Sequence, residues 1–379
     1  TFSNKIAMCE DEMKQGYYIH FSAKWMPGIA KKIDMQVAEF SKFYHMTEID
    51  VKAIEVPLWR RVCRLLPGGA IERSYEEALQ QMDHPAFVYI RRATADKSYV
   101  AFMKKIREKW PDCKIIIEIF TYPYDKDDFS RWTAWPYYFK EIYNRKKLPK
   151  YIDRYVTYSQ DEIIFGVPTV RTSNGILVDS VKLPQIRLEN TSTLNLIAVA
   201  FMQKHHGYER IIKGMWKYYR GTHEKEVILH LVGDGPEKKR YQKLTRKYQL
   251  EDKIIFYPTM VGEQLDEVYE KCDVAISALG VYKDGLRREN SLKTKEYMAK
   301  GFPMVTGSPV DRIPYDYPYV CEFSNDSTPI DVQRIVRFYD QLLQQHSKQE
   351  MQEELRSFVK QIADMPVVIK PVIDYIEEG

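Results

Sequence analysis

The sequence predicts an α/β protein built from two doubly wound domains, each with a parallel sheet, facing each other across a cleft. Three observations support this fold class. The chain has 379 residues, more than a single hydrophobic core usually serves. Short β-branched or aromatic runs alternate with longer amphipathic runs in both halves, as in parallel βαβ units. A stretch rich in turn formers, 168–175, separates the two alternations, and we expect it to be a hinge.

In the first half, the expected strands are 16–21, 48–56, 86–91 and 114–120. The expected helices are 29–44, 74–81 and 98–110. The run KIIIEIF at 114–120 is the clearest buried strand of this half, because it is apolar almost throughout.

The second half repeats the alternation. Its expected strands are 194–200, 226–232, 253–257, 273–277 and 302–306. Its expected helices are 208–219, 237–248, 263–271 and 292–300. The chain closes with helical patterns over 331–364, as one helix or as two with a break, and over 366–378. We therefore expect domains at 1–186 and 187–364, followed by a C-terminal helix at 365–379.

Composition excludes several classes of protein. A formal net charge of +4 is too small to indicate a nucleic-acid partner. The chain has no long apolar run typical of a transmembrane helix, and its first residues lack the apolar core of a signal peptide. Five scattered cysteines without a C-x-x-C pair predict neither a disulfide framework nor a metal site, and they indicate a reducing cytoplasm.

The first motif is Gly-Asp-Gly-Pro at 233–236, between an expected strand and an expected helix. Gly233 and Gly235 allow positive φ angles and close backbone approach, and Pro236 suits the start of a helix. The pattern is equally typical of an ordinary tight turn, so both interpretations stay open.

The second motif is the start of the helix expected at 292–300. Ser291 suits the N-cap, directly before Leu292. Such a helix start offers unpaired N–H groups and a positive dipole end to an anion. Lys293 and Lys295 add cationic side chains there.

Two carboxylates, Glu289 and Glu296, lie on either side of this helix start. Carboxylates accept hydrogen bonds from sugar hydroxyls. One of them could hold a ribose and the other a transferred hexose. The alternative is that all these charges are solvated groups at a helix end.

The order of these motifs resembles the second lobe of the family 4 glycosyltransferases of the GT-B fold. The resemblance runs from GDGP through IIFYPTMVGEQLDEVYEKCDVAISALG to the glutamate-flanked helix and GFPMV, and covers roughly 194–306. It implies two Rossmann-like domains, with an acceptor side in 1–186 and a nucleotide-sugar donor site in 187–364. It also implies a C-terminal helix that crosses back to the first domain.

The resemblance further implies the reaction. A hexose would pass from a UDP- or GDP-linked donor to a hydroxyl of a glycan or lipid-linked acceptor, in the biosynthesis of a surface polysaccharide or glycoconjugate. The anomeric configuration would be retained, without a required metal or cofactor. Two rivals remain open: a nucleotide-sugar epimerase of the same fold, and a non-catalytic nucleotide-sugar-binding scaffold.

The sequence departs from the family pattern at two places. Glu289 and Glu296 are one residue closer than the family's E-x7-E pair. The family's G-R-L is Ala-Phe-Met at 200–202, which lacks the arginine that binds diphosphate, and its K-G is His206-Gly207. The predicted donor-binding residues are Gly28, His206, Gly233, Ser291, Leu292, Lys293 and Glu296.

In the first lobe, Gly28 precedes an expected helix, where the family places a glycine loop facing the donor phosphates. An ordinary strand-to-helix turn explains it equally well. After the strand 114–120, Tyr122, Tyr124 and Asp125 stand where mainstream members have an H-D pair. We predict catalytic roles for Asp125, which could accept a proton from an acceptor hydroxyl, and for Glu289.

The segment 131–154 combines aromatic and basic residues. It holds seven basic and two acidic side chains together with seven aromatic ones. Aromatic residues facing a core, with solvated lysines, would explain it. The sharper interpretation is a peripheral surface for anionic lipid headgroups, which would place the protein at the inner face of the cytoplasmic membrane.

Overall fold

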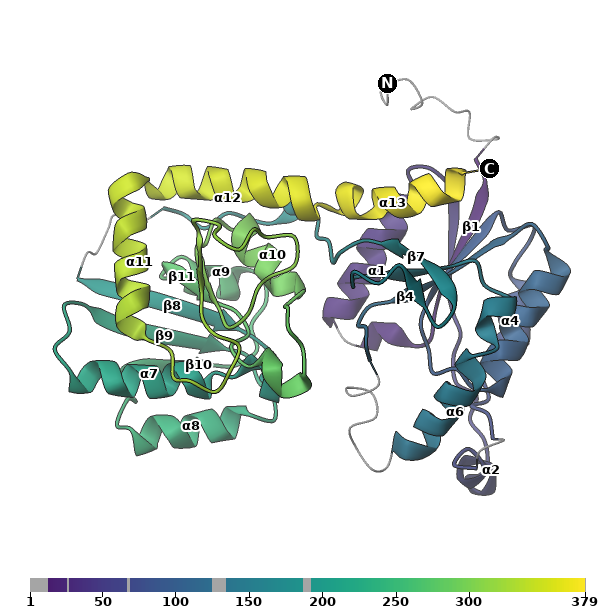
Figure 1. Ribbon diagram of the computed structural model, residues 1–379, viewed down its shortest axis with the longest axis horizontal. Helices are drawn as coiled ribbons and strands as arrows, with labels where there is room; N and C mark the ends of the chain where they lie inside the picture. Colours follow the sequence, from purple (N-terminus) through teal and green to yellow (C-terminus); the bar gives the residue numbers. More distant parts are fainter. Residues whose placement is uncertain (1–12, 26, 67–68, 125–133, 187–191, 379) are drawn as a thin grey trace. The chain divides into compact units, whose positions relative to one another are not determined.

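The computed structural model describes residues 13–25, 27–66, 69–124, 134–186 and 192–378 (Figure 1). The chain divides into two compact units. Unit 1 holds the described residues up to Ser173 together with those from Met365 onward, and unit 2 is Asn174–Asp364. Among the described helices, none is long and apolar enough to cross a membrane.

Unit 1 contains a seven-stranded sheet with the order β2-β1-β3-β4-β5-β7-β6, parallel except for β6. The strands are β1 (Gln15–His20), β2 (His45–Asp50), β3 (Phe87–Arg91), β4 (Lys114–Ile119), β5 (Arg154–Thr157), β6 (Ile163–Ile164) and β7 (Val167–Arg171). The helices are α1 (Pro27–Phe40), α2 (Leu58–Cys63), α3 (Tyr75–Gln80), α4 (Lys97–Lys109), α6 (Trp135–Arg145) and α13 (Met365–Glu377). The strand order reverses between β1 and β3, where ligands of doubly wound folds bind.

Unit 2 contains a six-stranded, fully parallel sheet with the order β10-β9-β8-β11-β12-β13. The strands are β8 (Thr193–Val199), β9 (Glu226–Val232), β10 (Ile254–Tyr257), β11 (Val274–Ile276), β12 (Met304–Thr306) and β13 (Val320–Glu322). The helices are α7 (Glu209–Arg220), α8 (Lys238–Lys247), α9 (Glu263–Tyr269), α10 (Leu292–Ala299), α11 (Val332–Gln345) and α12 (Lys348–Ala363). The predicted fold class of two parallel-sheet α/β domains is confirmed.

The helices of unit 2 cover both faces of its sheet. The chain moves outward from β8 to β10 and then returns to β11 on the other side of β8. Because crossover connections are right-handed, this reversal puts α7 and α8 on one face and α9 and α10 on the other (Figure 1). Both faces of the central strands are therefore buried, and Leu196, Leu229 and Ile276 are fully inaccessible. Burying each such side chain stabilises the fold by about 1.5–3 kcal/mol.

The C-terminal helix α13 belongs to unit 1, as predicted. Glu377 accepts hydrogen bonds from Lys14 Nζ and from the Tyr44 hydroxyl, both at 2.9 Å. Lys114 Nζ donates to the Tyr375 carbonyl at 2.9 Å. The last helix is thereby joined to the residue before β1, to β4 and to the turn between α1 and β2, all far away in the sequence.

The unit boundary lies earlier than the expected 186/187. Unit 2 begins at Asn174, inside the expected hinge 168–175. The reason is tertiary, because Ile176 and Val178 are buried in the core of unit 2 and Arg356 donates to the Val178 carbonyl at 2.8 Å.

Several expected elements are displaced or were missed. The strand expected at 48–56 is β2 at His45–Asp50, because its register is set by pairing of Gln15 with His45 on β1. The helical pattern 331–364 breaks at Ser347, whose side chain forms a capping box with Glu350. The elements α2, α6, β5, β6, β7 and β13 were not predicted.

Candidate donor site in unit 2

The loops after β8 and β11 meet where the strand order of unit 2 reverses. The amide of Leu279 donates to the His206 carbonyl at 2.8 Å, and the Gly280 amide donates to the His205 carbonyl at 3.0 Å. Gly207 makes this approach possible. It has φ +62, and a Cβ there would lie 2.6 Å from the Gly280 nitrogen.

Glu289 is buried beside this junction. Its Oε1 accepts hydrogen bonds from Ser277 Oγ at 2.7 Å and Ser291 Oγ at 2.8 Å. Its Oε2 is also buried and has no hydrogen bond to any residue that the structure describes. Burial raises the pKa of Glu289, and the two serines and Lys293 oppose this only in part. The carboxylate therefore organises the start of α10, and its predicted catalytic role stays a prediction.

Helix α10 begins at this carboxylate, as predicted. Ser291 is its N-cap, and its side chain accepts a hydrogen bond from the Thr294 amide. The first turn, which starts at Leu292, points its free N–H groups and the positive end of the helix dipole away from the helix. Lys295 does not contribute to an anion site, because it is fully buried and donates to the Asp311 carbonyl at 2.6 Å.

Lys293 faces His206 across the junction, with Nζ 3.1 Å from Nε2. The amide of Gln203 donates to Nδ1 of His206 at 3.0 Å, so Nδ1 carries no proton and the neutral ring carries its proton on Nε2. Two proton-bearing nitrogens then face each other. An anionic oxygen beside the pair, within hydrogen-bond distance of each nitrogen, could accept from both.

The electrostatics of this pair are consistent with an anion site. Burial, together with the charges of Lys293 and His205, lowers the pKa of His206 to about 2. Burial also lowers the pKa of Lys293 to about 8, against the attraction of Glu289 and Glu296. An anion would relieve the cost of holding charge in this partly buried place.

Comparison with known families points to one kind of enzyme. Residues 180–312 match the family model described as "Glycosyl transferases group 1", and this range contains the whole junction. This part of the chain is similar to group 1 glycosyltransferases. A search of the curated proteins found no significant match.

The chain also resembles solved structures in its fold. The chain is similar to a glycosyltransferase from Rickettsia africae, with TM-score 0.61, 12% identity, and coverage of 96% of this chain and 98% of that one. It is similar to Anabaena Alr3699/HepE in complex with UDP, with TM-score 0.62, 11% identity, and coverage of 97% and 100%. It is also similar to the lipopolysaccharide outer core galactosyltransferase WaaB, with TM-score 0.55, 14% identity, and coverage of 96% and 99%. At these identities the likeness concerns the fold.

The GDGP segment has a structural role. Gly233 has φ +125, and a Cβ there would lie 2.0 Å from the Ala200 carbonyl oxygen. Gly235 has φ +136, and its Cβ would lie 2.5 Å from the Met202 nitrogen. Both glycines let this turn pack against the loop after β8. Direct contact between Gly233 and a donor stays a prediction.

Glu296 lies one helical turn after Lys293 on α10, and it is partly exposed. Side chains three residues apart share one face of a helix, and Glu296 attracts the Lys293 ammonium. The structure therefore brings Lys293, Glu296 and His206 to the same edge of the sheet, as the sequence predicts. Their contact with the donor stays a prediction.

The first-lobe predictions have a different outcome. Asp125 lies outside the described residues. Tyr124 is buried and donates to Glu141 Oε1 at 2.6 Å, so it belongs to the core of unit 1. Gly28 lies in the first turn of α1, and a Cβ there would meet nothing within 4 Å.

This open space gives a prediction for Gly28→Ala. We expect the free energy of unfolding to rise by up to about 1 kcal/mol, because alanine favours the helix over glycine. Urea unfolding checks the gain. A fall in donor affinity in the same variant would support the predicted approach of donor phosphates to Gly28, whereas an unchanged affinity would favour an ordinary turn.

Sequence reasoning missed a buried charged cluster at the carboxyl edge of the unit 1 sheet. Glu118, which is fully buried on β4, lies 3.1 Å from Arg91 and 3.2 Å from Lys32. Burial alone would raise the pKa of Glu118, but Lys32 and Arg91 outweigh it and hold the pKa at about 2. The charged residue inside the apolar run KIIIEIF was the available signal.

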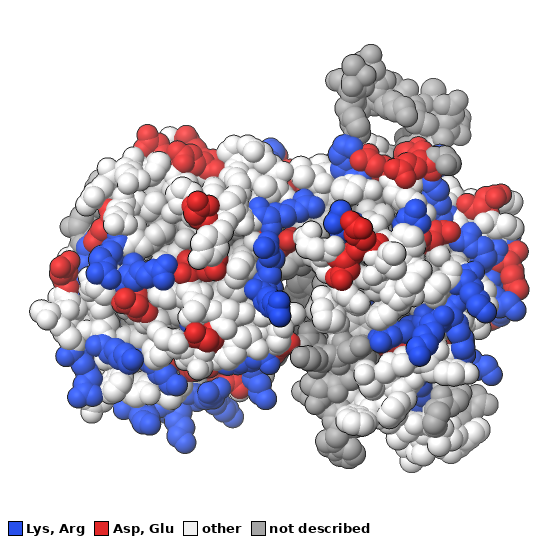
Figure 2. Space-filling model, in the orientation of Figure 1, with Lys and Arg blue, Asp and Glu red and all other residues white. Residues whose placement is uncertain are grey.

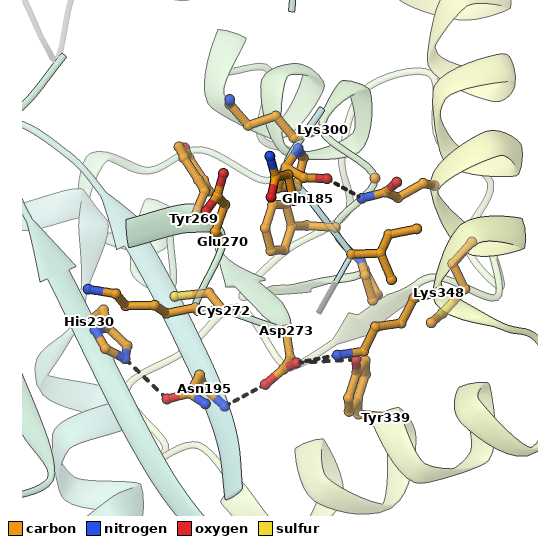
Figure 3. A pocket seen from close by; sticks show the side chains of 18 of the residues that line it. Gln185, Asn195, His230, Tyr269, Glu270, Cys272, Asp273, Lys300, Tyr339 and Lys348 are labelled. Carbon is orange, nitrogen blue, oxygen red and sulfur yellow. Dashed lines mark hydrogen bonds and ion pairs between the residues drawn. The ribbon is translucent and has the colours of Figure 1, made fainter. Parts of the chain in front are cut away.

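A cavity of about 330 Å³ lies at the opposite, amino edge of the unit 2 sheet (Figure 3). Its polar side chains form hydrogen bonds with one another. Asp273 Oδ1 lies 3.0 Å from Lys348 Nζ, and His230 Nε2 lies 3.2 Å from Asn195 Oδ1. Ligands of parallel α/β sheets bind at the carboxyl edge. The cavity is therefore not our candidate for the donor site.

Proposed function

We propose that the chain transfers a hexose from a UDP- or GDP-linked donor to a hydroxyl of a glycan or lipid-linked acceptor, with retention of configuration. The reaction would serve the biosynthesis of a surface polysaccharide or glycoconjugate in the cytoplasm. The observation that most directly supports this proposal is the pair of hydrogen-bond donors at the start of α10, Lys293 Nζ and His206 Nε2, which face each other. The family match over residues 180–312 supports a glycosyltransferase, and structures that contain UDP share the fold.

In this proposal the donor diphosphate accepts hydrogen bonds from Lys293 and from the first-turn N–H groups at Leu292. As the bond between the sugar and the diphosphate breaks, negative charge grows on the leaving group. A fixed ammonium and a helix dipole stabilise that charge without needing to reorganise. Glu296 would accept hydrogen bonds from donor hydroxyls. Asp125 stays our candidate for the acceptor side, and no metal is part of this scheme.

Calorimetric titration with UDP and with GDP tests the donor site. We expect one nucleotide to bind with a dissociation constant well below millimolar, and a panel of its sugar conjugates then identifies the hexose. Failure of both nucleotides to bind at millimolar concentration would remove the donor-site proposal.

One observation keeps the scaffold alternative open for testing. Phe201 stands where the resembled family has its diphosphate-binding arginine, and its side chain is exposed. A scaffold would bind the nucleotide-sugar and leave it intact. Release of UDP or GDP from the donor in the presence of an acceptor therefore separates the enzyme from the scaffold, and an epimerised donor sugar would indicate the epimerase.

The low pKa of Lys293 makes nucleotide binding dependent on pH. In the free protein this pKa is about 8, and a bound diphosphate raises it because the anion favours the ammonium. Binding is therefore strongest below pH 8 and weakens above it, by up to about tenfold per pH unit. Titration with the nucleotide from pH 7 to 9.5 checks this. The profile should become flat in Lys293→Met, and a flat profile in the unaltered protein would contradict the assignment.

A further inference from the structure

Helix α2 and the turn after it expose an apolar surface. Five side chains in this stretch are between 48% and 77% exposed, namely Leu58, Trp59, Val62, Leu65 and Leu66. Their spacing is helical, so such residues normally face a core. Here they face outward, and a contiguous exposed apolar surface of this kind marks an interaction site.

Helix α6 likewise exposes its apolar side chains. Trp135, Phe139 and Tyr143 recur every fourth residue, so they share one face, and each is more than half exposed. Polar residues of the helix are buried instead, with Glu141 accepting from the Ala95 amide at 2.5 Å. The polar face is thus held by internal hydrogen bonds, and the aromatic face is left to the outside.

The two helices lie close together in unit 1 (Figure 1). Burial lowers the pKa of Lys140 on α6, and Arg64, directly after α2, lowers it further against the opposing effect of Asp96. The charge of Arg64 therefore acts on Lys140, a buried residue of α6. Figure 2 shows a largely white surface over α2 and the lower end of α6 in this view. We call the six side chains Leu58, Trp59, Val62, Trp135, Phe139 and Tyr143 the α2–α6 surface.

Basic residues outnumber acidic ones in the segments that carry the α2–α6 surface, although Arg64 forms an ion pair with Glu72 at 3.2 Å. Residues 56–66 contain three arginines and no acidic residue, and residues 134–150 contain five basic residues and one acidic residue, Glu141, which is buried. Lys146 and Lys150 are exposed at the end of this stretch. Aromatic and aliphatic side chains rimmed by cations are typical of surfaces that enter the headgroup region of an anionic bilayer.

We propose that the α2–α6 surface docks onto an anionic phospholipid membrane. Its aromatic and aliphatic side chains enter the headgroup region, and the surrounding arginines and lysines contact the lipid phosphates. The proposal rests on the proposed function in one respect, since a membrane is where a lipid-linked acceptor is presented. A second copy of the chain fits less well, because a two-fold contact through this surface would bring the basic rims together.

Vesicle binding tests the proposal. The full chain is sedimented with vesicles of phosphatidylcholine mixed with phosphatidylglycerol, and with vesicles of phosphatidylcholine alone. We expect strong binding only to the anionic vesicles, weakened by added salt. The double variants Leu58→Ser/Trp59→Ser and Trp135→Ser/Phe139→Ser should each weaken binding by at least about tenfold. Val261→Ser and Tyr315→Ser, which alter exposed side chains in unit 2, are matched controls and should bind as the unaltered chain does.

A fluorescent label gives a second readout. Cys63 is exposed on α2, whereas Cys113 and Cys321 are buried. Cys272 is partly exposed, so in a Cys9→Ser/Cys272→Ser background an environment-sensitive dye on Cys63 should shift to shorter wavelengths with anionic vesicles. Absence of the shift and of sedimentation, or concentration-dependent self-association that the serine variants abolish, would overturn the proposal. Calorimetric titration with UDP and GDP on the same variants should be unchanged, so a failure here is distinguishable from a failure of the donor site.

Discussion

Lys293→Ala should lower the affinity for the donor nucleotide by about 10- to 100-fold, which corresponds to the 1.5–3 kcal/mol of a hydrogen bond to a charged group. The reason is local, because Lys293 Nζ lies 3.1 Å from His206 Nε2 and faces a proton-bearing nitrogen. Removing the ammonium removes the charge that would meet the diphosphate. Burial already lowers the pKa of this ammonium to about 8. Its removal should therefore change the free energy of unfolding by no more than about 1 kcal/mol.

The matched control lies on the same helix. Lys295 is buried and donates to the Asp311 carbonyl at 2.6 Å, so Lys295→Met leaves that carbonyl without its donor. We expect this variant to lose about 1–3 kcal/mol of stability and to bind the nucleotide normally. Calorimetry and urea unfolding on both variants separate the two roles. Normal nucleotide binding by Lys293→Ala would contradict the assignment of the anion site.

Gly233→Ala should destabilise unit 2 by about 2–6 kcal/mol. Its φ of +125 is in a region that other residues rarely adopt, which costs about 1–3 kcal/mol. Its Cβ would also lie 2.0 Å from the Ala200 carbonyl oxygen, and relieving such overpacking costs about 1–3 kcal/mol more. The neighbouring contact is backbone, so no side-chain rotation can make room.

Gly262→Ala separates the two contributions. Gly262 has φ +61 and ψ −142, and a Cβ there would meet nothing within 4 Å, so only the positive-φ backbone conformation is penalised, by about 1–3 kcal/mol. Urea unfolding of the full chain, with hydrogen exchange to assign the loss to unit 2, measures both. Equal losses in the two variants would show that close packing against Ala200 does not matter.

Much of the fold could be predicted from the sequence. The apolar runs of β4 and β9 and the amphipathic pattern of α7 depend on local spacing alone, and β9 was placed with its observed bounds at Glu226–Val232. Elements whose pattern of apolar and polar residues does not indicate their structure were missed. Strand β5 has only four residues. The pattern of α6 would predict that its aromatic face is buried, but in the structure its aromatic residues Trp135, Phe139 and Tyr143 face outward.

For the candidate site, the sequence by itself determined the helix start: an N-cap serine, a lysine two residues later and a glutamate after one more turn are local patterns that the structure retains. Only the tertiary structure decided the partners. Lys293 meets His206, while Lys295, two residues on, turns into the core. No spacing rule predicts this, because the strand order that joins the loops after β8 and β11 depends on pairings between residues far apart in the chain. The same holds for Gly233, whose need for glycine arises from the backbone of Ala200 against which it packs.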